Sequence, residues 1–220
     1  MDLRKVKAVL FDLDGTLLDT AKDIGTCLNE VMCRYGYPAR PLSDAPSFIG
    51  HGRTFMLKLA LPEGVSEALY PVIADEYAVH YRANCARFTE HFPGAREFLE
   101  FLQGRGYLTG MITNKTQETA EKIVKAYFPG NEFKMLWGNN GVRPLKPSLE
   151  SAELACRTLG LQPEEIMFVG DGDTDMAFAS KAGFVACGVT WGYRSREVLL
   201  ENGADLLIDS FAELQNLLSA

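Results

Sequence analysis

A run of apolar residues that ends abruptly in acidic ones, residues 6–16, constrains the fold more than any other stretch of this chain. Residues 9–11 have the composition of a fully buried strand, and Asp12 and Asp14 follow almost directly. Two carboxylates this close repel one another and are costly to bury unless a cation compensates their charge, as Mg²⁺ does. The alternative is a surface turn, because Asp-Gly is a common turn dipeptide. The stretch therefore predicts a buried strand that ends either in a metal site or in a turn.

The chain after residue 92 alternates short apolar runs with amphipathic segments. The apolar runs, which predict strands, lie at 107–113, 134–137, 166–170, 184–189 and 206–208. The amphipathic segments, which predict helices, lie at 93–103, 117–127, 148–159, 173–182 and 211–218. Strands that alternate with helices are typical of βαβ crossovers in a parallel sheet. The predicted fold class is α/β, with a Rossmann-like parallel sheet.

Residues 18–92 interrupt this alternation. Three segments in it have the apolar spacing of helices, at 22–35, 52–60 and 66–86. A βαβ crossover needs only about a dozen residues, so the whole segment is too long for a simple connection. We predict an α-helical cap, residues 18–92, inserted into a core of residues 1–17 and 93–220. The alternative is a pair of helices packed on the core.

The composition limits the partners of the protein. With 220 residues, of which 47% are apolar and 23% charged, the chain can form a proper core. A net charge of −7 argues against a nucleic-acid or anionic-membrane surface, so any positive charge that binds an anion must be local. We find no apolar run of membrane-spanning length and expect no signal peptide. Five cysteines without metal-binding spacing indicate reduced thiols and a cytoplasmic protein, and nothing in the sequence indicates the oligomeric state.

Polar residues follow three of the best predicted strands. They are Asp12 and Asp14, residues 113–115 (Thr-Asn-Lys), and residues 170–175, which include Asp171, Asp173 and Asp175. The carboxyl ends of parallel strands lie at one edge of a sheet, so these side chains are expected to face one crevice. Lys146, between two prolines, is a further candidate. The set indicates a metal and phosphate site, although each member alone could be a strand-end cap, a solvated lysine or a helix N-terminal charge. For Asp173, which receives no role, we keep the last interpretation.

Four motifs, in this order along the chain, resemble those of the haloacid dehalogenase-like superfamily. They are Asp-Leu-Asp-Gly-Thr-Leu at 12–17, Thr-Asn-Lys at 113–115, Lys-Pro at 146–147 and Gly-Asp-Gly-Asp-Thr-Asp at 170–175. The predicted cap resembles the smaller cap type of phosphoglycolate phosphatase and β-phosphoglucomutase relatives. The segments at 92–94, 188–193 and 203–205 resemble the phosphoglycolate phosphatase group more closely.

The resemblance implies a hydrolase that works through an aspartyl-phosphate intermediate. Asp12 would attack phosphorus, and Asp14 would protonate the leaving group and then activate water. Thr113 and Asn114 would hydrogen-bond the phosphoryl oxygens, and Lys146 would bridge Asp12 and the phosphate.

The resemblance also implies a Mg²⁺ cofactor. Its ligands would be Asp12, the backbone carbonyl of Asp14, and Asp171, and Asp175 would support the waters of the metal. The ion would offset the repulsion between the nucleophile and an anionic phosphate.

The substrate implied is a small phosphorylated metabolite, for which 2-phosphoglycolate is the best match to the group. Arg53 and His51 in the predicted cap, and Lys115 beside the phosphate-binding pair, are candidates to bind its carboxylate; Arg53 could equally be a solvated helix residue. A phosphomutase, a pyrophosphatase and a nucleotidase remain open, as does a non-catalytic binding module on this fold. Dehalogenation is disfavoured, because it does not need a second acidic residue such as Asp14. The absence of membrane spans excludes an ATP-driven pump.

Overall fold

Strand β1 (Ala8–Phe11) lies at the centre of a parallel sheet, as its apolar sequence requires. All four residues are fully buried, and the strand pairs with β4 (Leu108–Thr116) on one side and β6 (Ile166–Gly170) on the other. The computed structural model describes residues 2–130 and 133–219. Within them the sheet has the order β5-β4-β1-β6-β7-β8, in which the outer strands are β5 (Leu136–Asn139), β7 (Val185–Val189) and β8 (Leu206–Ile208). The predicted α/β fold is confirmed.

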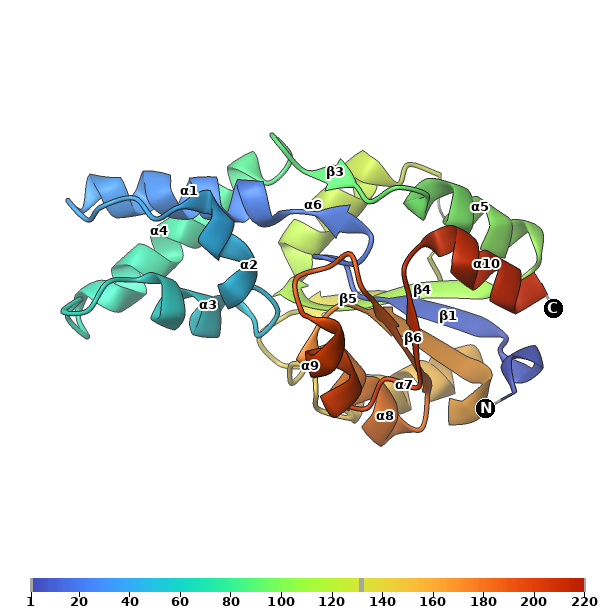
Figure 1. The fold of residues 1–220 in the computed structure, drawn as a ribbon. Coiled ribbons are helices and arrows are strands. Elements are labelled where there is room, and N and C mark those ends of the chain that lie inside the picture. The colour runs from blue at the N-terminus through green and yellow to red at the C-terminus, as the bar shows by residue number, and fades with distance from the viewer. Residues whose placement is uncertain (1, 131–132, 220) are drawn as a thin grey trace.

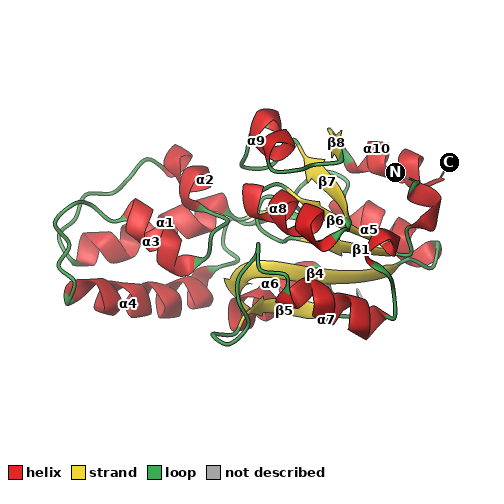
Figure 2. Ribbon diagram, turned by 90° about the horizontal axis from the view of Figure 1, so that it is seen from below, coloured by secondary structure: helices red, strands yellow, loops and turns green. Residues whose placement is uncertain are grey.

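Helices cover both faces of this sheet (Figures 1 and 2). One face carries α5 (Ala95–Gly104), α6 (Gln117–Tyr127) and α10 (Phe211–Ser219), and the other carries α7 (Glu150–Leu159), α8 (Asp173–Ala182) and α9 (Arg196–Glu201). Successive side chains of β1 alternate between the two resulting hydrophobic cores, Val9 and Phe11 in one and Ala8 and Leu10 in the other. The central strand is therefore apolar at every position.

The segment 18–92, for which we keep the name cap, extends from one end of the sheet (Figure 1). Its helices are α1 (Ala21–Arg34), α2 (Ala45–Phe48), α3 (Arg53–Ala60) and α4 (Leu69–Asn84). Helices α1 and α4 pack on one another, and their apolar side chains join the hydrophobic cluster beneath α5, α6 and α10. The three long helices of the cap lie where the sequence predicts them.

Two short strands join the cap to the rest of the chain. Strands β2 (Leu18–Asp19) and β3 (Glu90–His91) pair antiparallel. Next to them, the buried carboxylate of Asp23 accepts hydrogen bonds from the backbone nitrogens of Phe88 and Thr89 and from the Thr89 hydroxyl group. These hydrogen bonds thus connect the segment that enters the cap to the segment that leaves it.

Several short elements are absent from the sequence-based prediction. They are β2, β3, α2, α9 and the 3₁₀ helices Leu3–Lys5, Leu42–Asp44 and Pro163–Glu165. Each spans at most six residues, which is too few to show a hydrophobic period. Strand β5 also begins two residues later than the predicted 134–137.

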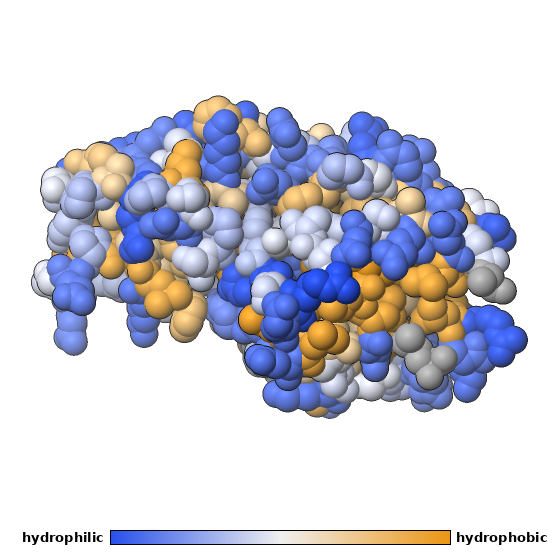
Figure 3. Space-filling view, viewed as in Figure 1, coloured by the Kyte–Doolittle hydropathy of each residue, from blue (hydrophilic) through white to orange (hydrophobic). Residues whose placement is uncertain are grey.

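The surface shows where the cap and the core differ. Hydrophilic side chains dominate the cap in the view of Figure 3, and the larger hydrophobic areas lie over the core. Among the residues that the structure describes, no helix combines the length and the apolar character needed to cross a membrane.

Candidate active site

The three strands β1, β4 and β6 bring the predicted polar residues to one edge of the sheet. Asp12 follows β1, between Thr113 on the neighbouring strand β4 and Asp171, which follows β6 on the other side. Strand β4 continues beyond its pairing with β1, which ends at Met111, so Thr113 and Lys115 lie inside the strand rather than after it. The crevice expected from the sequence is present.

Three carboxylates and one lysine form the buried centre of this crevice. Lys146 Nζ lies 2.9 Å from Asp12 Oδ1 and 2.7 Å from Asp175 Oδ1. Carboxylate oxygens of Asp12, Asp171 and Asp175 lie within 4.8 Å of one another. One ammonium group cannot neutralise three carboxylates, and a hard divalent cation binds such an oxygen set. The donor set therefore fits a divalent metal ion.

The pKa values of these groups show the same excess of negative charge. Burial raises the pKa of Asp12 to about 6, against the opposing effect of Lys146 and with further repulsion from Asp175 and Asp14. Burial also raises the pKa of Asp171 well above its ordinary value, and the neighbouring carboxylates add to the effect. Burial alone would lower the pKa of Lys146, but Asp12 and Asp175 raise it. The centre thus favours a cation, either a proton or a metal ion.

Two glycines make room for Asp171. A Cβ atom at Gly15 would lie 2.2 Å from Asp171 Oδ2, and one at Gly192 would lie 2.1 Å from Asp171 Cβ. Gly15 also has a φ of +83°, which side chains rarely adopt. The Thr16 hydroxyl and the Tyr193 backbone nitrogen donate to the two oxygens of Asp171, at 3.0 and 2.8 Å. The Asp171 carboxylate is therefore fixed from both sides.

Asp14 has partners of its own, separate from those of the Lys146 cluster. Lys115 Nζ donates to both of its oxygens, at 2.7 and 2.8 Å, and the Thr20 hydroxyl donates to Oδ1 at 2.5 Å. The same ammonium group lies 2.9 Å from the hydroxyl oxygen of Tyr81 on α4 of the cap. Lys115, a candidate to bind the substrate, is thus already paired with the candidate proton donor.

The amide group of Asn114 connects the core to the cap. Its Nδ2 donates to the backbone oxygens of Gly50 and Lys146, at 2.9 and 3.2 Å, and its Oδ1 accepts from the Lys146 backbone nitrogen at 2.8 Å. The amide group therefore fixes the backbone on either side of the lysine side chain. The hydroxyl oxygen of Thr113 accepts from the Lys115 backbone nitrogen at 3.2 Å, which leaves its proton for another acceptor.

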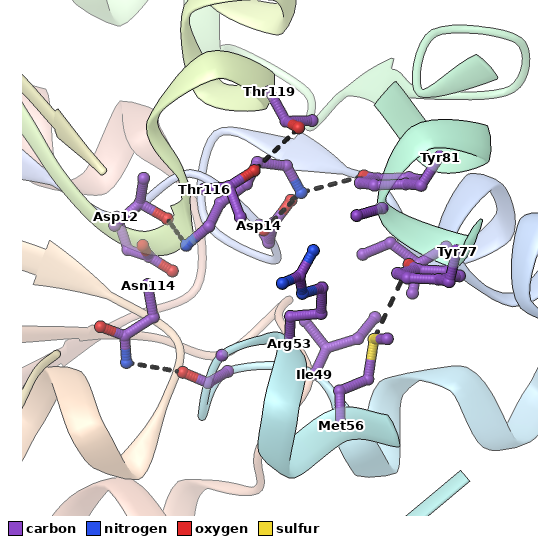
Figure 4. Close-up of a pocket in the computed structure, with 16 residues that line it drawn as sticks. Asp12, Asp14, Ile49, Arg53, Met56, Tyr77, Tyr81, Asn114, Thr116 and Thr119 are labelled. Carbon is purple, nitrogen blue, oxygen red and sulfur yellow. Dashed lines mark hydrogen bonds and ion pairs between the residues drawn. The ribbon is translucent and has the colours of Figure 1, made fainter. Parts of the chain in front are cut away.

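A cavity of about 70 Å³ lies between the cap and the core. Asp12, Asp14 and Thr113 contribute from the core, and Ile49, Arg53, Met56 and Tyr77 are among the contributors from the cap. Figure 4 shows the guanidinium group of Arg53 pointing toward Asp14. Among the described residues, no hydrogen bond or ion pair holds that group. The cavity thus combines apolar walls with a guanidinium group that is available to bind an anion.

The structure separates His51 from Arg53. His51 is not among the described residues that line the cavity, and its Nε2 lies 3.2 Å from Asp173 Oδ2. Arg194 approaches the other oxygen of Asp173 at 3.4 Å. Asp173, which the sequence leaves without a role, is thus a contact between the core and the cap.

Several residues around the site are not predicted from the sequence. Thr16 and Tyr193 hold Asp171, Thr20 holds Asp14, and Tyr81 binds Lys115. Thr16 and Tyr193 belong to segments that resemble the family, but no role follows from that likeness alone. Tyr81 lies on a cap helix whose sequence carries no motif.

Comparisons with known proteins agree with this geometry. Residues 9–189 match the model of the haloacid dehalogenase-like hydrolase family. A phosphoglycolate phosphatase from Chromobacterium violaceum is 33% identical over 99% of both chains. An N-acetylmuramic acid 6-phosphate phosphatase from Pseudomonas putida is 31% identical over 98% of this chain and 97% of its own.

A solved structure shares the fold over nearly the whole chain. It is described as a predicted phosphoglycolate phosphatase from Haemophilus somnus 129PT and superposes with a TM-score of 0.90 at 25% identity. The match covers 96% of this chain and 97% of that one. The family model spans all four motifs that form the crevice. The chain belongs to the haloacid dehalogenase-like hydrolase family.

Proposed function

We propose that this protein is a Mg²⁺-dependent phosphatase that hydrolyses a small phosphomonoester through an aspartyl-phosphate. The observation that carries the proposal is the buried group of Asp12, Asp171, Asp175 and Lys146, in which Asp12 and Asp171 follow two adjacent strands. It combines a nucleophile, a set of oxygen ligands and a fixed ammonium group in one place.

Asp12 performs the covalent step in this proposal. Its carboxylate attacks phosphorus, and the bond between phosphorus and the substrate oxygen breaks. Lys146, 2.9 Å from Asp12 Oδ1, holds the nucleophile and attracts the phosphoryl oxygens. The free proton of Thr113 supplies a hydrogen bond to the same oxygens. The Asn114 amide group supports them indirectly, since it fixes the backbone at Lys146.

Asp14 transfers the proton. It protonates the leaving oxygen and then accepts a proton from the water that cleaves the acyl-phosphate. Lys115 and Thr20 fix the direction of its carboxylate. Because Asp14 is held by Lys115 and Thr20 while Asp12 is held by Lys146, the two carboxylates keep separate tasks.

Asp12, Asp171 and the backbone carbonyl of Asp14 would hold the Mg²⁺ ion, and Asp175 would support its waters. When bound, the ion supplies positive charge that offsets the repulsion between the nucleophile and the phosphate. Thr16 and Tyr193 keep the carboxylate of Asp171 in place for this task.

The cap acts as a cover that moves against the core in this proposal. Residues 18–92 are joined to it by two connections, near 17–19 and 91–92, and these would form the hinge. Closure excludes bulk water and limits the site to small substrates. Fixing the cap away from the core with an engineered crosslink should therefore abolish turnover of a small phosphate ester.

The substrate we infer is 2-phosphoglycolate. Arg53 supplies a guanidinium group for its carboxylate inside a cavity of about 70 Å³, which is suited to a small ligand. Two of the relatives are named for phosphorylated acids, phosphoglycolate and N-acetylmuramic acid 6-phosphate. The larger of these is the second candidate substrate.

A phosphate-release screen tests the proposal. We expect 2-phosphoglycolate to be hydrolysed with a higher kcat/KM than ethyl phosphate, and Arg53→Ala to reduce that preference about tenfold or more, since a paired carboxylate contact is lost. Arg53→Lys keeps the charge without the bidentate geometry, so its preference for 2-phosphoglycolate should lie between those of the parent and Arg53→Ala. Higher turnover of sugar phosphates, nucleotides or pyrophosphate than of 2-phosphoglycolate would contradict the proposed substrate but not the proposed phosphatase activity. No phosphate release with any ester would contradict both.

A further inference from the structure

One segment of the cap, residues 46–52, receives hydrogen bonds and an ion pair from side chains of the core. We call it the docking loop. Arg194, in the core after β7, donates to the backbone oxygen of Pro46 at 2.8 Å and to that of Ile49 at 2.6 Å. Asn114 donates to the backbone oxygen of Gly50 at 2.9 Å. These contacts hold the backbone of the loop rather than its side chains.

The position of Arg194 suits this task. The two oxygens that it binds lie in and just after α2, at the end of a helix where backbone oxygens lack helical partners. A guanidinium group has several donors in one plane, so it can bind both oxygens at once. Its remaining Nε faces Asp173 at 3.4 Å. The Arg194 side chain is largely buried, with 16% exposure, so its guanidinium group has few other orientations.

Asp173 contacts both the core and the docking loop. One of its oxygens faces Arg194 of the core, and the other lies 3.2 Å from the His51 ring of the docking loop. Asp173 belongs to the acidic motif at 170–175, yet it is not part of the carboxylate group formed by Asp12, Asp171 and Asp175. The position therefore contributes to the contact with the cap.

The docking loop leads directly into the residue that points into the cavity. Arg53 begins α3 one residue after the loop ends, and no hydrogen bond or ion pair with the described residues fixes its guanidinium group. Gly50 and Gly52 have φ values of +115° and +83°, so the loop follows a path that glycine permits and does not enforce. The backbone in front of Arg53 is thus held by Arg194 and Asn114 of the core, and Asp173 holds the His51 side chain beside it.

We propose that Arg194 and Asp173 are positioning residues that dock the cap loop 46–52 on the core and thereby place Arg53 in the substrate cavity. The link to substrate selection rests on the proposed role of Arg53, whereas the docking itself does not. Neither residue needs to touch the substrate. Their effect reaches it through three residues of backbone between Ile49 and Arg53.

The decisive experiment compares Arg194→Ala and Arg194→Lys with Arg196→Ala. The Arg196 side chain lies two residues further on, is 52% exposed and pairs with Asp209, so its loss is the matched control. The first readout is hydrogen–deuterium exchange of a peptide covering residues 45–53 in the free enzyme. We expect faster exchange in Arg194→Ala, a smaller increase in Arg194→Lys, and none in Arg196→Ala. Unchanged exchange in folded Arg194→Ala and Arg194→Lys proteins overturns the docking role.

The second readout is the ratio of kcat/KM for 2-phosphoglycolate to kcat/KM for ethyl phosphate. Arg194→Ala should lower the ratio about tenfold, because small displacements of a binding group have large effects. In an Arg53→Ala background, Arg194→Ala should leave the ratio unchanged. Faster exchange with an undiminished ratio overturns the placement of Arg53. If the parent enzyme does not prefer 2-phosphoglycolate, the proposed substrate fails, and the same comparison is made with the ester it prefers.

Discussion

The ammonium group of Lys115 lies 2.7 and 2.8 Å from the two carboxylate oxygens of Asp14, and 2.9 Å from the hydroxyl oxygen of Tyr81. Lys115 belongs to the core and Tyr81 to the cap. One lysine therefore touches both the group proposed to move the proton and the unit proposed to close over the substrate. The side chain of Lys115 is 5% exposed, so water competes little for these contacts.

Removing this lysine should impair proton transfer selectively. In Lys115→Met, Asp14 keeps the hydrogen bond from the Thr20 hydroxyl group but loses both contacts with the lysine, so its carboxylate is less firmly oriented. We expect kcat for ethyl phosphate to fall about 10²-fold, as for other losses in acid catalysis, and kcat for p-nitrophenyl phosphate to fall much less, since p-nitrophenolate leaves without a proton. Tyr81→Phe, which keeps the ring and removes the hydroxyl group, should have a smaller effect of the same kind. An equal loss on both esters would argue against a role through Asp14.

Replacing the nucleophile should abolish activity and stabilise the metal-free protein. Asp12→Asn keeps the shape of the side chain and loses the reacting carboxylate, so turnover should fall by several orders of magnitude. Burial raises the pKa of Asp12 to about 6, so its contribution to stability is present at low pH and is lost as the pH rises through about 6. The variant should therefore gain roughly 1–3 kcal/mol of unfolding free energy over the parent at pH 8, and less at pH 4.

Urea titrations of both proteins in EDTA measure this difference. Appreciable turnover of a homogeneous Asp12→Asn protein, with reversion to the acid excluded by mass spectrometry, would remove Asp12 from the covalent step. A constant difference in stability between pH 4 and pH 8 would instead contradict the excess of buried negative charge.

A divalent metal ion should stabilise the fold as well as support turnover. Binding at 100 times Kd stabilises a folded protein by about 2.7 kcal/mol. We expect Mg²⁺ to raise Tm and to restore activity after EDTA, and Ca²⁺ to raise Tm while it inhibits turnover, since its looser geometry misplaces the nucleophile. Asp171→Asn should weaken the effects of the metal ions on Tm and on activity. Asp209→Asn, a change on the exposed surface, should leave both effects as they are in the parent. Full activity after exhaustive EDTA treatment would contradict the metal requirement.

Asp23 should matter for the stability of the cap junction. Its buried carboxylate accepts from two backbone nitrogens, those of Phe88 and Thr89. Asp23→Ala leaves these donors without that partner, which costs about 1–3 kcal/mol for the buried nitrogen of Thr89 and less for that of the exposed Phe88. Asp23→Asn retains an acceptor oxygen and should cost less. Thermal unfolding measured by circular dichroism tests both variants, and equal Tm values for parent and Asp23→Ala would contradict the assigned role.

The architecture follows from the sequence because its elements are long and periodic. The apolar run at β1 and the alternation after residue 92 predict a parallel sheet, and the helical spacing of 18–92 predicts the cap helices. The crevice is predictable for the same reason, since parallel strands bring Asp12, Thr113 and Asp171 to one edge.

The partners of these residues are not predictable in this way. Lys115 and Arg53 are both cations near the cavity, and only the packing of α4 and α3 decides that the first pairs with Asp14 and the second does not. The same holds for Asp173, because its contact with His51 depends on how the cap lies on the core. Such contacts join segments far apart in the chain, and neither segment has a periodic sequence pattern from which the contact could be predicted.

The pairing of β2 with β3 brings the two ends of the cap segment side by side. Leu18 lies opposite His91 and Asp19 opposite Glu90, so the chain leaves the core and returns to it at adjacent points. Opposite residues of an antiparallel pair are about 5 Å apart, a gap that a two-residue turn closes. A cap from a relative with another substrate could therefore be grafted at these four positions without stretching the chain. Such a graft would have to supply its own partners for Arg194 and Lys115, which lose their cap contacts but keep those with Asp173 and Asp14 of the core.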